Sequence, residues 1–174
     1  MENDVQALFL GPKSENRKFF KEMLNFVIDE HIHWRRDFHP SDHPITSIAE
    51  RRSVPHEETL MRTEEALWEL SSKLKSGSIP AFSPRYLGHM LSDTLMAANL
   101  GYLATILYNP NNCSYDASSA STPLELEVGS QLAVLFGYDP ETAWGHLCSG
   151  GTVANYEGLW VARNLKSLAY AVRK

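Results

Sequence analysis

A glycine turn near the end of the sequence has the composition of an anion-binding site. Gly150 and Gly151 follow a short apolar run, Ala143 to Cys148, and precede a segment of helical periodicity from Val153 to about Val172. Glycines let backbone N–H groups approach a ligand closely, and the start of a helix offers unpaired donors and a partial positive charge. We therefore expect a strand, a turn and a helix, with a phosphate group held by Gly150, Gly151 and Thr152. A turn that only caps the helix and binds nothing fits the same residues about equally well.

The other side chains with reactive groups point less clearly to chemistry. His31 and His33 lie two apart in an expected helix and project from different faces, so we predict solvated or capping roles and no metal site. His89 precedes an apolar helix, where a ligand pocket and a structural role are about equally consistent with its position. His146 is expected to be a packed side chain, and Cys148 a buried, unreactive thiol. No lysine directly follows the glycine turn, which excludes the GxxxxGK[ST] pattern of nucleoside-triphosphate enzymes.

Two amphipathic helices are expected in the first half of the chain. Between Ser14 and Arg36 apolar residues recur at spacings of three and four, which predicts a helix with one apolar face. This face consists of Phe19, Phe20, Met23, Phe26, Val27 and Ile28. Leucines recur every seven residues between Glu57 and Lys75, and Gly77 is expected to end that helix in a left-handed conformation. The stretch from Asp37 to Pro55 contains three prolines and predicts an extended linker.

Two more helices are expected before the glycine turn. The segment from Ser92 to Tyr108 is apolar on nearly every side, so it predicts a helix that must be buried. Thr122 and Glu125 have the spacing of a capping box, in which each of the two side chains binds the backbone of the other residue. They predict a helix from Pro123 to Phe136, closed by Gly137.

The composition disfavours several classes of protein. The chain has 174 residues, a formal net charge of −5, 43% hydrophobic and 21% charged residues, which is the balance of an ordinary globular domain. Its basic residues are scattered, so we expect no nucleic-acid partner. The longest mostly apolar run, Leu95 to Tyr108, is shorter than the roughly 20 residues that span a bilayer, so we expect no membrane span. Two cysteines and no recognisable leader favour a cytoplasmic location.

Three segments carry motifs in a defined order: Ser83–Met90, Ser118–Glu127 and Gly145–Asn155. Together they resemble the pyridoxal-phosphate-dependent group II amino-acid decarboxylases, in the branch that acts on aromatic amino acids such as tyrosine. The resemblance extends over nearly the whole chain. It implies an α/β protein of the fold-type I class as a whole. This chain would be a mostly α part of it, with an N-terminal helical segment and the first strand, loop and helix of the large domain.

The resemblance also implies roles for particular residues. The turn at Gly150, Gly151 and Thr152 would hold the phosphate of pyridoxal 5'-phosphate. The segment with His89, Met90 and Ser92 would line the substrate pocket, and the loop from Asn112 to Tyr115 would reach the site of a neighbouring subunit, with Tyr115 as a substrate contact.

On the scale of the whole chain, the resemblance implies two segments of an obligate homodimer. Residues 1–110 would be a helical dimerisation segment, and residues 111–174 the incomplete start of the cofactor-binding large domain. The lysine that binds the cofactor in this family has no counterpart here, and neither do its ring-stacking histidine and its aspartate at the pyridine nitrogen. We therefore assign no catalytic residue to this chain.

These features predict the N-terminal part of a longer enzyme that removes the carboxylate of an aromatic, tyrosine-like L-amino acid as carbon dioxide. Its partners would be the remainder of the same enzyme and a second subunit, and the chain would be inactive alone. Two alternatives are a decarboxylase of glutamate or another acidic amino acid from the same family, and a non-catalytic helical interaction module.

Overall fold

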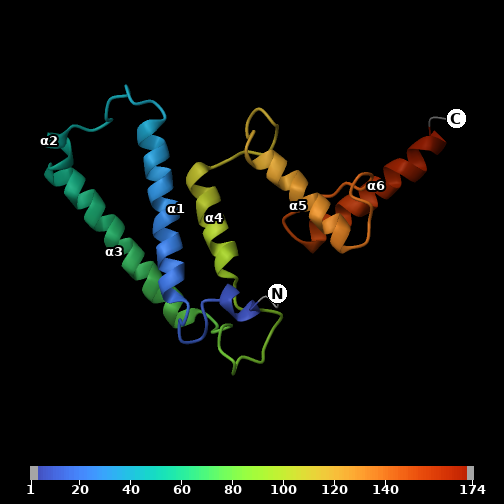
Figure 1. Cartoon of the computed structure of the whole chain (residues 1–174), viewed down its shortest axis with the longest axis horizontal. Coiled ribbons are helices and arrows are strands. Elements are labelled where there is room, and N and C mark those ends of the chain that lie inside the picture. The colour runs from blue at the N-terminus through green and yellow to red at the C-terminus, as the bar shows by residue number, and fades with distance from the viewer. Residues whose placement is uncertain (1–3, 172–174) are drawn as a thin grey trace. The chain divides into compact units, whose positions relative to one another are not determined.

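The computed structural model describes the backbone of residues 4–171 and the side chains as far as residue 167. The chain divides after Asn109 into two compact units (Figure 1). The first unit contains η1 (Val5–Leu8), α1 (Arg17–Asp37), α2 (Ile48–Arg51), α3 (Val54–Gly77) and α4 (Met96–Tyr108). The second contains α5 (Ser121–Leu135) and α6 (Gly151–Ala171).

The described residues form no strand, which corrects one part of the predicted fold. The run Ala143–Cys148, expected to be a strand, is irregular. A strand is stable only when its N–H and C=O groups pair with a neighbour, and this part of the chain supplies no neighbouring strand. One isolated antiparallel bridge joins Phe9 to Leu95 in the first unit. The mostly α character of the chain is confirmed, whereas the strand is wrong.

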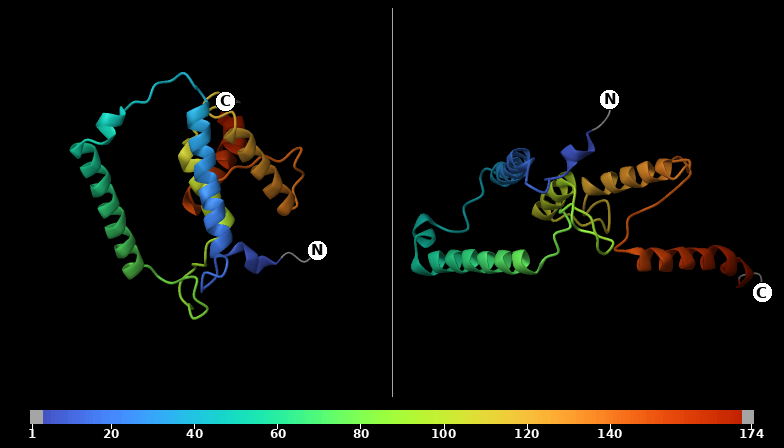
Figure 2. Two further views of the ribbon diagram at one scale, coloured as in Figure 1. Left: turned by 60° about the vertical axis from the view of Figure 1, so that its left-hand side comes forward. Right: turned by 90° about the horizontal axis from the view of Figure 1, so that it is seen from below.

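The first unit is organised around α1 and α4, which pack against each other (Figures 1 and 2). The predicted helix from Ser14 is confirmed with a later start, because Ser14 has a φ of 58° that no α-helix contains. Of its predicted apolar face, Phe20, Met23 and Val27 are half-buried, whereas Phe19 and Phe26 are exposed. In this unit, packing against one neighbouring helix covers only part of that face.

His31 is the buried histidine of the described residues, at 7% exposure. Its ring lies edge-on to Tyr108 of α4, with the ring centroids 4.8 Å apart, and its Nδ1 atom has no hydrogen-bond partner among the described residues. The predicted solvated or capping role is therefore wrong for His31. His33 is exposed, and its Nδ1 atom lies 4.0 Å from Glu30 Oε1. A step of two residues along a helix changes the direction of the side chain by about 200°, so His33 points away from the side on which His31 meets α4.

The predicted linker contains a helical turn, so the expectation of a wholly extended segment is wrong. The Ser47 hydroxyl accepts a hydrogen bond from the Glu50 N–H at 3.1 Å, and the Glu50 carboxylate accepts one from the Ser47 N–H at 2.7 Å. This capping box starts α2. Pro55 lies in the first turn of α3, where a missing N–H costs no intrahelical hydrogen bond.

The predicted second helix is confirmed as α3, although its ends differ from those expected. It begins at Val54 and ends at Gly77, which is not among the residues with a positive φ. Ser78 caps it in an extended conformation instead, so the predicted left-handed cap is wrong. Within the described first unit α3 has a small contact with α2, its neighbour in the chain, and Leu60, Leu67 and Leu74 remain exposed.

The predicted apolar helix is confirmed as α4, with a start four residues later than expected. Met96, in its first turn, is 2% exposed. Burial is confined to one side, because Tyr102 and Ile106 on the other side are exposed. The expectation of burial all round is thus not met within the first unit. No described helix combines the length and apolarity needed to cross a bilayer.

The second unit begins its helical part with α5. Gly137 ends this helix as predicted: its φ is 78°, and the Tyr138 N–H donates to the Ala133 carbonyl at 2.8 Å, the pattern of a Schellman motif. The predicted capping box does not form. The Thr122 hydroxyl is buried without a described partner, and the Glu125 carboxylate accepts a hydrogen bond from Asn112 at 2.7 Å instead.

Candidate functional site

The glycine turn lies where sequence analysis placed it, directly before α6. The helix begins at Gly151, and its first backbone hydrogen bond runs from the Ala154 N–H to the Gly150 carbonyl at 3.1 Å. The N–H groups of Gly151, Thr152 and Val153 therefore have no acceptor within the helix. The predicted end at Val172 lies outside the described residues. The helix is confirmed, with a start two residues before the expected one.

The turn leaves room for a ligand in this unit. Gly150 has a φ of 150°, a conformation that residues with a side chain rarely adopt. A Cβ atom built on Gly150 or on Gly151 would meet no atom within 4 Å, and Thr152 is exposed. Three backbone donors, a nearby hydroxyl and open space suit the oxygens of a phosphate ester, and no neighbouring side chain in the described unit fills the space next to the glycines.

A contact between side chains on either side of the turn was missed by sequence analysis. His146 Nε2 lies 3.0 Å from Glu157 Oε2, and each side chain is about one-third exposed (33% and 39%). The expectation that His146 is packed is wrong, because the residue is exposed and its ring lies 5.0 Å from the likewise exposed Trp144 ring. Its charge partner comes from the second turn of α6. His146 and Glu157 are eleven positions apart and lie in different segments, so neither helical nor strand periodicity predicts their contact. The contact is seen only in the folded chain.

Cys148 is half-exposed, so the prediction of a buried thiol is wrong. Its Sγ lies 3.5 Å from the Gly150 carbonyl oxygen, to which it donates a weak hydrogen bond. The thiol therefore contacts the backbone of the turn directly. No described histidine pairs with it, so the structure gives no sign of an activated nucleophile.

α5 fixes the segment that leads into the turn. A Cβ atom on Gly129 would lie 2.5 Å from the Gly145 carbonyl oxygen, so only glycine permits this close approach. Beside the contact is a hollow of about 200 Å³. Its lining residues are Gly129, Leu132, Ala133, Phe136, Tyr138, Ala143, Trp144, Gly145 and His146.

The loop before α5 is held by a polar cluster that includes Asn112. The Asn112 amide donates to Glu125 at 2.7 Å, and its carbonyl oxygen accepts from the Ser121 hydroxyl, which also contacts the buried Ser118. Tyr115, in the same loop, is 61% exposed. The cluster thus fixes the base of the loop and leaves the Tyr115 side chain accessible.

The remaining predicted substrate residues lie together on one loop of the first unit. Met90 is fully open to solvent, and His89 and Ser92 are also exposed. His89 has a φ of 41°, a left-handed conformation that is uncommon for residues other than glycine and concentrates at functional sites. The predicted substrate roles of these residues and of Tyr115, and the phosphate role of the turn, stay predictions. In the described part of the chain no three metal-binding side chains gather.

Three named proteins match this chain over most of its length. The L-tyrosine decarboxylase of Enterococcus faecalis is 41% identical over 174 residues, which cover 99% of this chain. The L-tyrosine decarboxylase of Levilactobacillus brevis is 42% identical over 172 residues, or 98% of this chain. The aspartate 1-decarboxylase of Aliivibrio fischeri is 30% identical over 161 residues, or 84% of this chain.

These matches span only part of each relative. The aligned region is 28% of the Enterococcus faecalis protein, 27% of the Levilactobacillus brevis protein and 28% of the Aliivibrio fischeri protein. No family model matches the chain.

Proposed function

We propose that this chain contributes a cofactor-phosphate site and part of a substrate pocket to a longer enzyme. The proposal starts from the matches above, in which the chain corresponds to an N-terminal portion of a tyrosine decarboxylase-like protein. The whole enzyme would use pyridoxal 5'-phosphate and adopt the fold-type I architecture. It would convert an aromatic, tyrosine-like L-amino acid to its amine and carbon dioxide. A cytoplasmic homodimer is part of the same proposal.

The geometry of the glycine turn is the observation that supports this proposal most directly. Backbone donors at Gly151, Thr152 and Val153 would bind the phosphate, and the Thr152 hydroxyl would add a further donor. The bound cofactor would supply an electron sink for the bond that breaks at the α-carbon. The chain itself would hold the phosphate and thereby orient the cofactor ring, while the lysine, aspartate and histidine of the family would come from the remainder of the enzyme.

The residues proposed for the substrate are His89, Met90, Ser92 and Tyr115. All four are exposed within their own units, so their side chains are available to contact a substrate or another part of the enzyme. The left-handed conformation of His89 fixes the direction of its loop and supports a binding role there.

The test compares two variants of the full-length enzyme. Thr152→Ala removes one hydrogen bond to a charged phosphate, worth about 1.5–3 kcal/mol, so the affinity for pyridoxal 5'-phosphate should fall roughly ten- to a hundredfold. His89→Ala should leave that affinity unchanged and raise the KM for tyrosine. Equilibrium dialysis measures the first quantity, and amine release measures the second.

Thr63→Ala is the matched control, because the Thr63 hydroxyl is exposed and bonds only to its own helix. It should change neither quantity. If Thr152→Ala retains full cofactor affinity, the proposed hydrogen bond from the Thr152 hydroxyl to the phosphate is wrong. If His89→Ala releases the cofactor, the residue belongs to the cofactor site and its proposed role is wrong.

A decarboxylase of acidic amino acids is the second candidate, because the Aliivibrio fischeri relative is an aspartate decarboxylase at 30% identity. The higher identity to two tyrosine decarboxylases favours the aromatic substrate. Assays of the full-length enzyme with tyrosine, glutamate and aspartate separate the candidates. Absence of turnover with all three substrates, together with a stable chain that binds no cofactor, would support a helical interaction module instead.

A further inference from the structure

The loop that carries Tyr115 is fastened to the start of α5 on both sides of that residue. Before Tyr115, the Asn112 amide donates a hydrogen bond to the Glu125 carboxylate, with Nδ2 and Oε2 2.7 Å apart. After it, the backbone N–H of Ser118 donates to the Tyr115 carbonyl at 3.2 Å, and Ser118 is only 8% exposed. Both anchors belong to the second unit, so they restrict the path of the short segment between them.

Hydroxyl groups join the two anchors into one network. The Ser121 hydroxyl donates to the Asn112 carbonyl oxygen and also contacts the Ser118 hydroxyl. A hydroxyl has one proton, and Ser121 uses its own on Asn112, so the Ser118 hydroxyl is the donor in the second contact. An unbroken series of hydrogen bonds therefore connects the Glu125 carboxylate with the Tyr115 carbonyl.

Glu125 makes its contact with the loop in place of the helix cap that its position favours. In a capping box its carboxylate would accept from the Thr122 backbone N–H, but that N–H donates to the Ser118 carbonyl at 3.1 Å. The Thr122 hydroxyl is buried without a described partner. A buried polar group without a partner is destabilising, and such departures from local preference are expected mainly at functional sites. The arrangement therefore favours the position of the loop over the stability of the helix end.

Tyr115 is held by its backbone, and its side chain remains free. The carbonyl belongs to the network, whereas the side chain is 61% exposed. A fixed backbone limits a side chain to a few staggered rotamers. A ring that is already restricted in this way loses little conformational freedom when it binds a ligand.

The anchor formed by Asn112 and Glu125 also borders the segment that leads into the glycine turn. A hollow of about 380 Å³ adjoins their contact. Its apolar lining includes Leu147, which lies three residues before Gly150. Within the second unit, α5 therefore fixes the loop with Tyr115 next to the approach to the turn.

We propose that Asn112 and Glu125 are positioning residues that hold Tyr115 in the direction in which it contacts the substrate. They act through the loop and touch neither the substrate nor the cofactor. Without their hydrogen bond the loop occupies the binding-competent conformation for a smaller fraction of the time, which weakens the apparent affinity for the substrate. This inference rests on the proposed function, in which Tyr115 contacts an aromatic amino acid.

The experiment measures KM and kcat for tyrosine, and the affinity for pyridoxal 5'-phosphate, in variants of the full-length enzyme. Glu125→Ala should raise KM roughly two- to tenfold, the effect of losing one hydrogen bond, with kcat and cofactor affinity unchanged. Glu125→Gln keeps a side-chain carbonyl oxygen that can accept from Asn112, so its KM should stay close to that of the wild type. Asn112→Ala removes the same contact from the loop and should raise KM at least as much as Glu125→Ala.

The Tyr115→Ala background distinguishes positioning from a general structural role. Tyr115→Ala alone should raise KM at least as much as Glu125→Ala does. Because Glu125 acts through Tyr115, Glu125→Ala should have no further effect in that background, and a double-mutant cycle measures this coupling.

Glu127→Ala is the matched control, because this exposed carboxylate lies on the same helix and its described hydrogen bond is to Gln131. Its KM should match that of the wild type. A thermal melt of each variant shows whether it is folded. If Glu125→Ala does not fold, Asn112→Ala takes its place in the cycle and tests the same contact.

The outcomes separate failure of this inference from failure of the proposed function. If Tyr115→Ala raises KM but Glu125→Ala does not, or if Glu125→Ala raises it by the same factor in both backgrounds, the positioning role is wrong and the substrate role of Tyr115 stands. A loss of cofactor affinity in Glu125→Ala also contradicts the positioning role. If Tyr115→Ala leaves KM unchanged, the proposed substrate contact itself is wrong, and this inference falls with it.

Discussion

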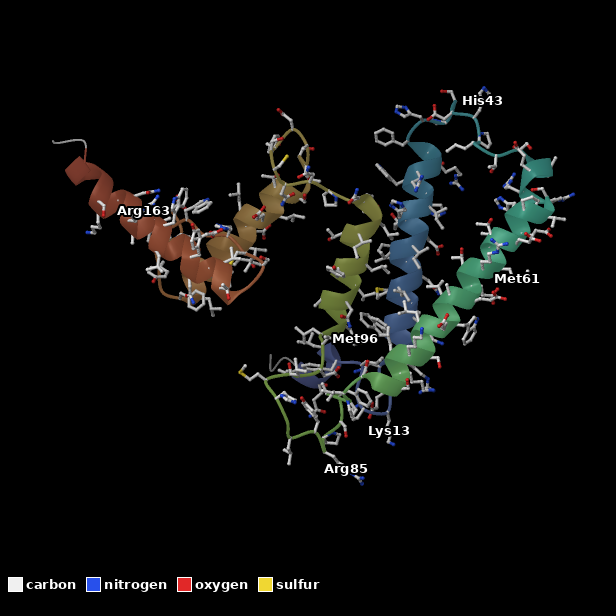
Figure 3. All side chains as sticks on the ribbon, turned by 180° about the vertical axis from the view of Figure 1, so that it is seen from behind. Lys13, His43, Met61, Arg85, Met96 and Arg163 are labelled. Atoms are coloured by element: carbon white, nitrogen blue, oxygen red, sulfur yellow. The ribbon has the colours of Figure 1, made fainter. Side chains whose placement is uncertain are left out.

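At the scale of single residues, the burial of a side chain decides what its loss costs, even when two side chains are chemically identical. Met96 is 2% exposed at the start of α4, whereas Met61 on α3 is 54% exposed (Figure 3). Truncating a buried methionine removes apolar contacts and leaves a cavity, at a cost of about 2–5 kcal/mol. A substitution at an exposed position usually changes the free energy of unfolding by less than about 0.5 kcal/mol.

We therefore expect Met96→Ala to destabilise the chain by about 2–5 kcal/mol and Met61→Ala to have almost no effect. Thermal and urea unfolding, followed by the circular dichroism of the helices, give both free energies. Equal losses of stability in the two variants would show that Met96 is not part of a packed core.

At the scale of elements, α2 shows how local hydrogen bonds start a helix within a proline-rich stretch. The Ser47 backbone N–H, followed by its hydroxyl, holds the pKa of the Glu50 carboxyl below its usual value of 4.5, because these groups stabilise the charged carboxylate. The folded pKa is depressed, so this stabilisation is fully present above the unfolded pKa. It is lost as the pH falls through the folded value.

We expect the capping box to open as the pH falls below about 4.5, the ordinary value for the Glu50 carboxyl. The chemical shift of the Ser47 amide, followed by NMR during an acid titration, reports the hydrogen bond directly. In Glu50→Gln the side chain does not titrate, so the shift should stay constant over the same range. A Ser47 amide that titrates identically in both proteins would exclude Glu50 as its acceptor.

At the scale of the whole molecule, the apolar surface on α3 fits the proposal that this chain is part of a longer enzyme. Leu60, Leu67 and Leu74 lie on exposed positions of α3, which within the described first unit has only a small contact with α2. Exposed apolar surface of this kind marks an interaction site. The chain spans about 28% of the length of its decarboxylase relatives, which leaves most of such an enzyme available to cover that surface.

We expect Leu67→Ala to have little effect on the 174-residue chain and to destabilise the full-length enzyme by about 2–5 kcal/mol. Glu65→Ala, at an exposed polar position of the same helix, is the control and should be near neutral in both proteins. Unfolding by urea provides the comparison. A near-neutral Leu67→Ala in the full-length enzyme would mean that the leucines of α3 stay uncovered there.

Local sequence patterns are enough to predict the main helices, because helical periodicity, prolines in the first turn and terminating glycines act within a few residues of one another. The helices now labelled α1, α3, α4, α5 and α6 were all predicted, and so was the left-handed Gly137 at the end of α5. The three motifs also pointed to the decarboxylases, the same group of enzymes as the relatives that the chain matches.

Which side chains meet depends on how separate segments pack against each other. His31 is buried against Tyr108, Glu125 accepts a hydrogen bond from Asn112 instead of forming the expected capping box, and His146 pairs with Glu157. The run Ala143–Cys148 before the glycine turn has no strand structure, because no neighbouring strand pairs with it in the described residues. In each case the outcome depends on a partner, present or absent, that lies outside the local sequence pattern. Local periodicity fixes the direction of a side chain from its own helix, but the partner that it meets is set by packing between segments.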